Sequence, residues 1–151
     1  MIEFREARRA DLPAIVRLLA DDPLGAGREA MCDKFPDTYA RAFDALKAQK
    51  GNEVIVGDQS GEVLACLQLT IVPGLSRNGA TRAFIEGVRV AKSLRGQGVG
   101  EALVKHALER ARAAGCRLAQ LTSDKSRVDA HRFYERLGFK ATSIGMKLDL
   151  E

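Results

Sequence analysis

Arg95-Gly96-Gln97-Gly98-Val99-Gly100 is the segment from which the fold of this 151-residue chain can be inferred. It lies between a strand-like run at residues 83–90 and an amphipathic helical pattern that begins near Val99. Glycines at a strand-to-helix turn let several backbone N–H groups point at one anion, and the helix dipole and Arg95 add positive charge. The segment therefore predicts a diphosphate-binding loop.

Two common phosphate loops do not match this spacing, which is Arg-x-x-Gly-x-Gly. An NTPase loop needs Gly-Lys followed by Ser or Thr, and a dinucleotide fingerprint needs a third glycine where this chain has Glu101. Taken alone, the loop also fits an ordinary strand-to-helix turn whose glycines meet steric needs. The residues downstream decide between these interpretations.

Composition indicates one soluble domain spanning residues 1–151. The chain is 46% hydrophobic and 29% charged, which is ordinary for a globular protein of this length. It has no apolar run of about 18 residues, and its first nine residues are too charged for a secretory signal, so we expect a cytoplasmic protein without a membrane partner.

Charge and cysteine usage narrow the classes of ligand. The net charge of +4 is spread along the chain without a basic run interleaved with aromatic residues, so we expect no nucleic-acid partner. A modest positive excess suits an anionic small ligand. Cys32, Cys66 and Cys116 are widely spaced and form no C-x-x-C pair, so neither a disulfide framework nor a metal site is indicated.

The order of elements predicts a mixed α/β sheet with helices on its faces. A helix between two strands implies a parallel pair with a right-handed crossover, which places the glycine loop at the carboxyl end of its strand, where open α/β sheets bind ligands. We expect strands at residues 2–5, 53–57, 62–72, 80–90 and 116–122, helices at about 12–19, 37–49, 98–114 and 129–137, and a closing hairpin of short strands at 139–143 and 146–150.

Two segments of the chain form one pattern. The first is Val88-Arg89-Val90 followed by the glycine loop, and the second is Ala130-His131-Arg132-Phe133-Tyr134-Glu135-Arg136-Leu137-Gly138-Phe139. Together they resemble the acetyl-CoA site of the GNAT superfamily of N-acetyltransferases. The resemblance covers residues 84–139, and the first half matches only in element order. It implies a central, mostly antiparallel twisted sheet with one splayed parallel strand pair and about four flanking helices.

The resemblance also implies acetyl-CoA as cosubstrate, without a metal. The backbone of the strand would bind the pantetheine arm as an added edge, while Arg95 and the N–H groups of the loop would hold the diphosphate. The residues expected to bind acetyl-CoA are Val88, Val90, Arg95, Gly96, Gln97, Gly98, Val99, Gly100 and Glu101.

Tyr134 matches the position of the family's general acid, which would protonate the departing CoA thiolate. Phenol and thiol have ordinary pKa values near 10 and 8.5, so this transfer is not steeply uphill. The alternative is a core aromatic at helical spacing with Ala130 and Leu137. The family's frequent Asn three residues before Ala130 is Arg127 here, so Ser126 or Asp129 would have to replace it as polar partner, or simply cap the helix.

Glu86 is the candidate general base. It lies two residues before Val88 and should share its face unless a bulge intervenes, and a buried carboxylate there would have a raised pKa. The alternative is an ion pair with Arg82 or Arg89. Gly87 hints at a bulge that would free a backbone N–H for the developing oxyanion.

The predicted function is transfer of acetyl from acetyl-CoA to a primary amine of a small molecule, by direct attack with both substrates bound. The amine should bind near the early helices and residues 22–34, with Phe35 and Tyr39 as walls. The alternatives are a protein N-terminal or lysine acetyltransferase, a non-catalytic acyl-CoA-binding regulatory module, and a DNA-binding regulator. The resemblance also favours a homodimer.

Overall fold

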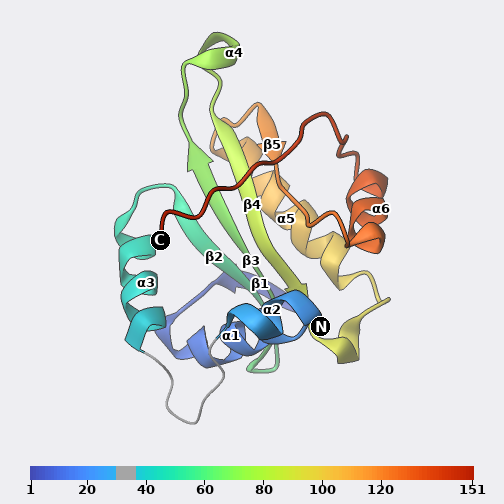
Figure 1. Ribbon diagram of the computed structural model, residues 1–151. Coiled ribbons are helices and arrows are strands. Elements are labelled where there is room, and N and C mark those ends of the chain that lie inside the picture. The colour runs from blue at the N-terminus through green and yellow to red at the C-terminus, as the bar shows by residue number, and fades with distance from the viewer. Residues whose placement is uncertain (30–36) are drawn as a thin grey trace.

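The computed structural model describes residues 1–29 and 37–151, which form a five-stranded sheet flanked by helices (Figure 1). The strands lie in chain order and pair antiparallel, except that the last pair, β4 with β5, is parallel. Their bounds are β1 (Glu3–Glu6), β2 (Asn52–Gln59), β3 (Glu62–Val72), β4 (Arg82–Val90) and β5 (Leu118–Gln120). The predicted mixed sheet with one parallel pair is confirmed.

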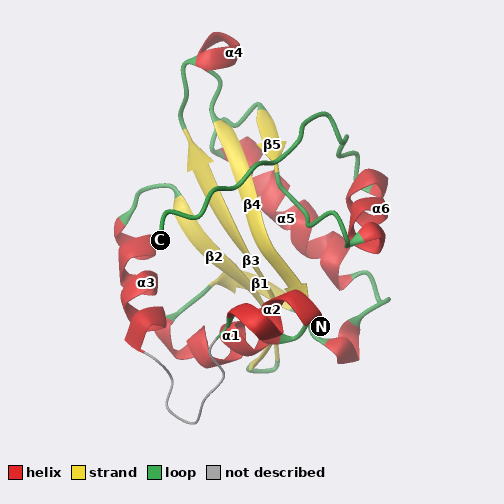
Figure 2. Cartoon of the chain, in the orientation of Figure 1, coloured by secondary structure: helices red, strands yellow, loops and turns green. Residues whose placement is uncertain are grey.

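The four predicted helices are present, and the described residues add two short ones (Figure 2). The short helix α2 forms within residues 22–34, where we expected no helix, because Asp22 caps its first turn and Pro23 starts it. The other, α4, is a tight turn at the tip of the β3–β4 hairpin. The helices are α1 (Leu12–Ala20), α2 (Pro23–Arg28), α3 (Asp37–Ala48), α4 (Ser76–Gly79), α5 (Val99–Ala113) and α6 (Val128–Arg136). Within the described residues, no helix is long and apolar enough to cross a membrane.

The sheet buries apolar side chains on both faces, because successive strand residues point to opposite sides. One face packs against α5, and the other packs against α1 and α3. The first core contains Ile55, Leu67, Leu69, Ile85, Leu103 and Val104, and the second contains Ile15, Leu18, Phe43, Val56 and Cys66. The glycine loop and the end of β4 are thereby anchored to a rigid scaffold.

A β-bulge interrupts β4 at Gly87, as its sequence suggested. Glu86 pairs with Gln68 and Arg89 pairs with Cys66, so two residues of β4 oppose the single residue Leu67. Gly87 has φ +62°, a conformation that side-chain-bearing residues rarely adopt. The extra residue shifts the alternation of side chains beyond it.

The parallel pair of strands splays soon after it forms. Only three residues of β4, Arg82 to Phe84, pair with β5, and within the described residues β4 then continues to Val90 without a paired strand on that side. The N–H of Ala91 donates to the Leu64 carbonyl of β3 (2.8 Å), so strand alternation turns the N–H and C=O groups of Val90 and Val88 toward the open edge.

The closing hairpin expected at residues 139–143 and 146–150 does not form, so that prediction is wrong. Residues 139–151 contain no strand, and residues 140–151 are exposed. A two-residue hairpin there would place Ile144 and Gly145 in the turn. The turns that match strand twist require positive φ at the first of these positions, which the β-branched Ile144 strongly disfavours.

Asp11 is a buried charged residue directly before α1, and its removal should destabilise the fold. Arg5 donates two hydrogen bonds to its carboxylate, of 2.8 and 3.0 Å, and the Arg8 N–H donates a third. We expect Asp11→Asn to lower the free energy of unfolding at pH 7 by about 3 kcal/mol, since it leaves Arg5 without its main partner. Urea titrations of both proteins measure this difference.

The difference should depend on pH. The hydrogen bonds from Arg5, opposed in part by burial, lower the pKa of Asp11 below its ordinary value of 3.8. A carboxylate with a lowered folded pKa stabilises the fold above that ordinary value and loses its contribution as pH falls through the folded pKa. The gap between wild type and variant should therefore close in acid. A gap of constant size from pH 7 to pH 2.5 would show that the charge of Asp11 is not responsible.

Candidate active site

The glycine loop forms an uncapped helix start. Gly96 and Gly98 have φ of +77° and +80°, and Gly98 is the N-cap of α5. A Cβ at either glycine would meet nothing within 4 Å, so it is the positive φ and not space that requires glycine. The first intrahelical bond runs from Ala102 N–H to Gly98 C=O (3.1 Å), and among the described residues no side chain caps the turn. The preceding N–H groups can therefore hold an anion.

The two polar side chains of the loop turn away from the start of α5. Arg95 Nε donates to the Val90 carbonyl (3.2 Å), and Arg95 Nη2 lies 3.6 Å from a carboxylate oxygen of Asp21. Gln97 Nε2 donates to the Ser93 carbonyl (3.0 Å). The Arg95 side chain thus lies between the end of β4 and the end of α1.

The open edge of β4 lies directly before this loop. Its outward carbonyls accept from arginines: Arg89 Nη1 donates to Val88 O (3.0 Å), and Arg95 Nε donates to Val90 O. The side chains of both valines pack against the α5-side core. Strand packing and an exposed polar edge therefore coexist at Val88 and Val90.

Tyr134 lies on α6, partly buried against the α5-side core. Its ring makes edge contacts with Phe133 (5.1 Å between centroids) and Phe139 (5.9 Å). Phe133 also lies close to the start of α5, since a Cβ on Gly100 would be 3.4 Å from its ring. Burial raises the pKa of the Tyr134 phenol, and the charges of Arg127 and Arg89 oppose the rise. The phenol is consequently protonated at neutral pH.

Glu86 is exposed, which contradicts the expectation of a buried carboxylate. Because Ile85 is buried toward α5, Glu86 points to the other face, whereas the bulge returns Val88 to the α5 side. The two residues therefore do not share a face. Glu86 lies on the α1–α2 side of β4, where the sequence places the amine.

Neither arginine proposed as a partner pairs with Glu86 in the described residues. Arg82 donates to Gln120 (3.3 Å) and lies 5.5 Å from the Phe84 ring centre. Arg89 Nε lies 3.0 Å from Asp22 Oδ2. The carboxylate of Glu86 is thus available to a substrate.

Asp22 and Arg89 form a contact that sequence reasoning missed. Although burial opposes the shift, the Gly25 N–H and the charges of Arg89, Arg127 and Arg28 lower the pKa of Asp22. The contact joins α2 to β4 through two residues that are 67 positions apart in the sequence. The guanidinium groups of Arg89, Arg127 and Arg28 all act on the Asp22 carboxylate. The one sequence signal for Asp22 is the Asp22-Pro23 pair, which is typical of a helix start.

The other residues that the sequence placed near the site make different contacts or lie outside the described residues. Ser126 donates to Asp124 through both its N–H (2.9 Å) and its hydroxyl (2.7 Å), and Arg127 takes the N-cap position of α6. Tyr39 donates to Glu29 (3.0 Å). Phe35, with residues 30–34 of the expected acceptor loop, lies outside the described residues.

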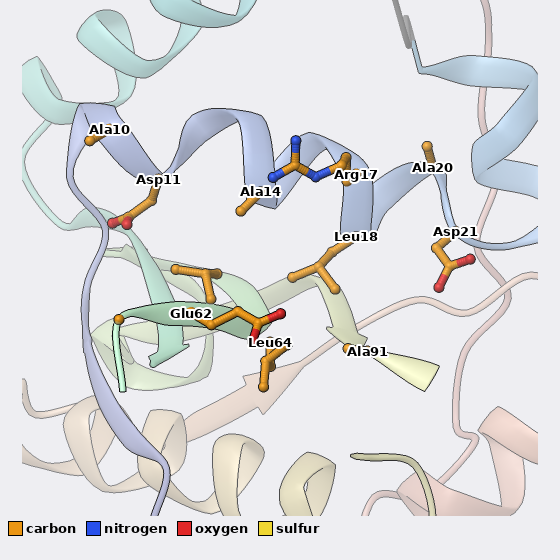
Figure 3. Close-up of a pocket in the computed structure, with 12 residues that line it drawn as sticks. Ala10, Asp11, Ala14, Arg17, Leu18, Ala20, Asp21, Glu62, Leu64 and Ala91 are labelled. Atoms are coloured by element: carbon orange, nitrogen blue, oxygen red, sulfur yellow. The ribbon is translucent and has the colours of Figure 1, made fainter. Parts of the chain in front are cut away.

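A surface groove beside α1 is separate from these groups (Figure 3). Arg17 of α1 and Glu62 of β3 border it, and Asp21 and Ala91 connect its end to the neighbourhood of Arg95. Neither Tyr134 nor Glu86 lines it. The outward carbonyls of Val88 and Val90 and the glycine loop lie instead along the open edge of β4 and the start of α5. Across the described ranges, no group of three or more His, Cys, Asp or Glu could hold a metal ion.

Comparisons with known proteins agree on one family. The model of the acetyltransferase (GNAT) family matches residues 12–139. The chain is 36% identical to glucosamine 6-phosphate N-acetyltransferase of Trypanosoma brucei brucei, over 99% of this chain and 96% of the relative. It is 45% identical to aminoalkylphosphonate N-acetyltransferase of Salmonella typhimurium strain LT2 over 56 residues, which are 37% of this chain and 36% of the relative.

A solved structure is more similar still. It is that of a protein from Bacillus halodurans C-125 named a transcriptional regulator, with 48% identity and a TM-score of 0.96, over 99% of this chain and all of that one (100%). The chain therefore shares its complete fold with this protein.

Proposed function

The chain belongs to the GNAT family of acetyltransferases, and we propose that it transfers an acetyl group from acetyl-CoA to the primary amine of a small, anionic molecule. The observation that carries this proposal is the open edge of β4 leading into the uncapped start of α5. We also propose that residues 1–151 form one catalytic domain, because β4, α5 and α6, which form the site, share one sheet and its core.

The residues present fit the coenzyme. Val88 and Val90 would hold its pantetheine arm through their outward backbone groups, as an added strand is held. The N–H groups of residues 96–101 would hold its diphosphate, and Arg95 would exchange its contact with Val90 for the phosphate oxygens. The coenzyme supplies the acetyl thioester.

Two side chains of this protein would then transfer protons. Glu86 takes a proton from the ammonium form of the substrate, directly or through water, so that the amine nitrogen can attack the thioester carbonyl. Once the C–N bond has formed, the C–S bond breaks and Tyr134 donates its phenolic proton to the departing sulfur, while the second proton lost by the nitrogen restores the phenol. We assign polarisation of the carbonyl to the strand backbone at the Gly87 bulge.

Two observations support an anionic acceptor. Arg89 and Arg127 act electrostatically on both Asp22 and Tyr134, and Arg28 acts on Asp22, so three positive charges lie around this part of the site. The substrates in the names of both N-acetyltransferase relatives combine an amine with a phosphate or phosphonate. We therefore propose an acceptor that carries its amine near such a group.

A screen of matched acceptors tests this specificity. With acetyl-CoA and thiol detection, we expect glucosamine 6-phosphate and 2-aminoethylphosphonate to be used with kcat/KM at least 10-fold higher than glucosamine and ethanolamine. One charge-assisted hydrogen bond of about 1.5–3 kcal/mol accounts for such a ratio. Equal use of charged and neutral members would refute the anionic preference, and acetylation of peptides alone would favour a protein acetyltransferase.

The name of the Bacillus halodurans relative favours a second candidate, a DNA-binding regulator that uses the same fold. A shift assay over a range of salt concentrations separates the two, because DNA binding weakens steeply with salt. A non-catalytic acyl-CoA module would instead show thermal stabilisation by the coenzyme and no thiol release with any amine. We expect amine-dependent thiol release and no shifted DNA.

A further inference from the structure

The side chain of Arg89 lies where the open edge of β4 meets the α1–α2 side of the sheet. Val88 packs against the α5-side core, so Arg89, the next residue of the strand, points to the opposite face. There its Nε lies 3.0 Å from Asp22 Oδ2, while its Nη1 donates to the outward Val88 carbonyl (3.0 Å). One guanidinium group therefore borders both the side where the amine is expected and the edge where the coenzyme is expected.

This guanidinium is largely buried, yet much of its hydrogen-bonding capacity is unused. Only 11% of the Arg89 side chain is exposed. Within the described residues its Nε makes no hydrogen bond, despite the nearby carboxylate, and its Nη2 makes none either. Burying charged donors without acceptors costs free energy, so these N–H groups favour an anion that comes from outside the chain.

Asp22 holds Arg89 in place without using all of its donors. The Oδ1 atom of Asp22 accepts the Gly25 N–H (2.5 Å) at the N-cap of α2. Its Oδ2 atom, which faces Arg89, is buried and has no hydrogen bond in the part of the chain that the structure describes. The carboxylate is thus anchored to α2 and keeps the guanidinium at one place beside β4.

Arg89 and Glu86 are neighbours on the same face of β4. They pair with Cys66 and Gln68 of β3, which are two positions apart, so the bulge leaves their Cα atoms roughly 7 Å apart along the strand. The charge of Arg89 also acts on Tyr134, where it opposes the rise in pKa that burial causes. A small molecule that contacts Arg89 is therefore within reach of both side chains proposed to transfer protons.

We propose that Arg89 binds the phosphate or phosphonate group of the acceptor and thereby determines the preference for anionic amines. This inference rests on the proposed acetyl transfer and assigns its specificity to one residue. The unused N–H groups of Arg89 form a planar set of donors that suits the oxygens of such an anion. Glu86 receives the ammonium group of the same molecule beside it.

A ratio of rates tests the assignment. In each protein, kcat/KM for 2-aminoethylphosphonate is divided by kcat/KM for ethanolamine, so the fraction of folded enzyme cancels. Arg89→Gln should lower this ratio by at least about 10-fold, through a higher KM for the phosphonate, because one charge-assisted contact is lost. The matched control Arg132→Gln, which changes an exposed arginine of α6, should keep the wild-type ratio.

Two further variants separate recognition from stability. Arg89→Gln leaves the carboxylate of Asp22 without its nearest cation, so the double variant Asp22→Asn with Arg89→Gln is measured beside it and should show the same low ratio. Arg89→Lys keeps the charge and should recover part of the ratio. A lysine variant no more selective than the glutamine variant would overturn an electrostatic role for Arg89.

The wild type distinguishes failure of this inference from failure of the proposed function. A wild type that prefers the phosphonate, with an equal preference in Arg89→Gln and in the double variant, would overturn the role of Arg89 alone. Equal use of the two acceptors by the wild type would overturn the anionic preference together with this role. Absence of amine-dependent thiol release from the wild type would overturn acetyl transfer itself, and this inference with it.

Discussion

Tyr134→Phe should lower kcat for acetyl transfer by roughly 10²- to 10⁴-fold, the usual contribution of a positioned general acid. The substitution removes one hydroxyl and keeps the ring that packs against Phe133 and Phe139. We therefore expect KM for acetyl-CoA to change by less than about threefold and the melting temperature to stay nearly constant. Initial rates from thiol detection, with acetyl-CoA varied at saturating amine, measure both constants.

The dependence of kcat on pH separates proton donation from packing. A general acid must be protonated, and burial raises the pKa of Tyr134 above its ordinary value of 10, so wild-type activity should persist through pH 10 and fall only above it. The phenylalanine variant should lack that basic limb. If both proteins show the same rate and the same profile, water protonates the thiolate and Tyr134 is a core aromatic.

The local parts of the site could be predicted from sequence, because each depends on neighbours a few positions apart. The glycine loop, the start of α5 and the bulge at Gly87 all follow from where glycine permits positive φ. The pattern of alternating residues likewise predicts β3 with its observed bounds, Glu62–Val72. Family resemblance added the splayed pair, which the ladder between β4 and β5 confirms.

The predictions that were wrong, and the contact that was missed, depend on three-dimensional geometry that the sequence pattern does not contain. One inserted residue at Gly87 is enough to put Glu86 and Val88 on opposite faces, since side-chain direction alternates with every residue. The contact of Asp22 with Arg89 requires α2 to be placed on β4. Residues 146–150 have the alternating pattern of a strand, but the pattern does not show whether a neighbouring strand is available, and these residues form no strand in the structure.

Gly98→Val should weaken binding of coenzyme A by roughly 100-fold, which is about 2.7 kcal/mol. Gly98 has φ +80°, and a β-branched residue there would force the turn to reorganise. The N–H groups at the start of α5 would then no longer point at one anion, and each such bond to a charged group is worth about 1.5–3 kcal/mol. Isothermal titration with coenzyme A measures the loss.

Gly115→Val is the matched control, because it imposes the same strain just beyond the other end of α5. Gly115 has φ +84°, and a Cβ there would also meet nothing within 4 Å. Both variants should lose about 1–2 kcal/mol of stability, the cost of left-handed backbone in a residue with a side chain. Only Gly98→Val should lose coenzyme affinity. Equal affinities in the two variants would mean that the loop does not bind the diphosphate, and the proposed site at the open edge of β4 would have to be abandoned.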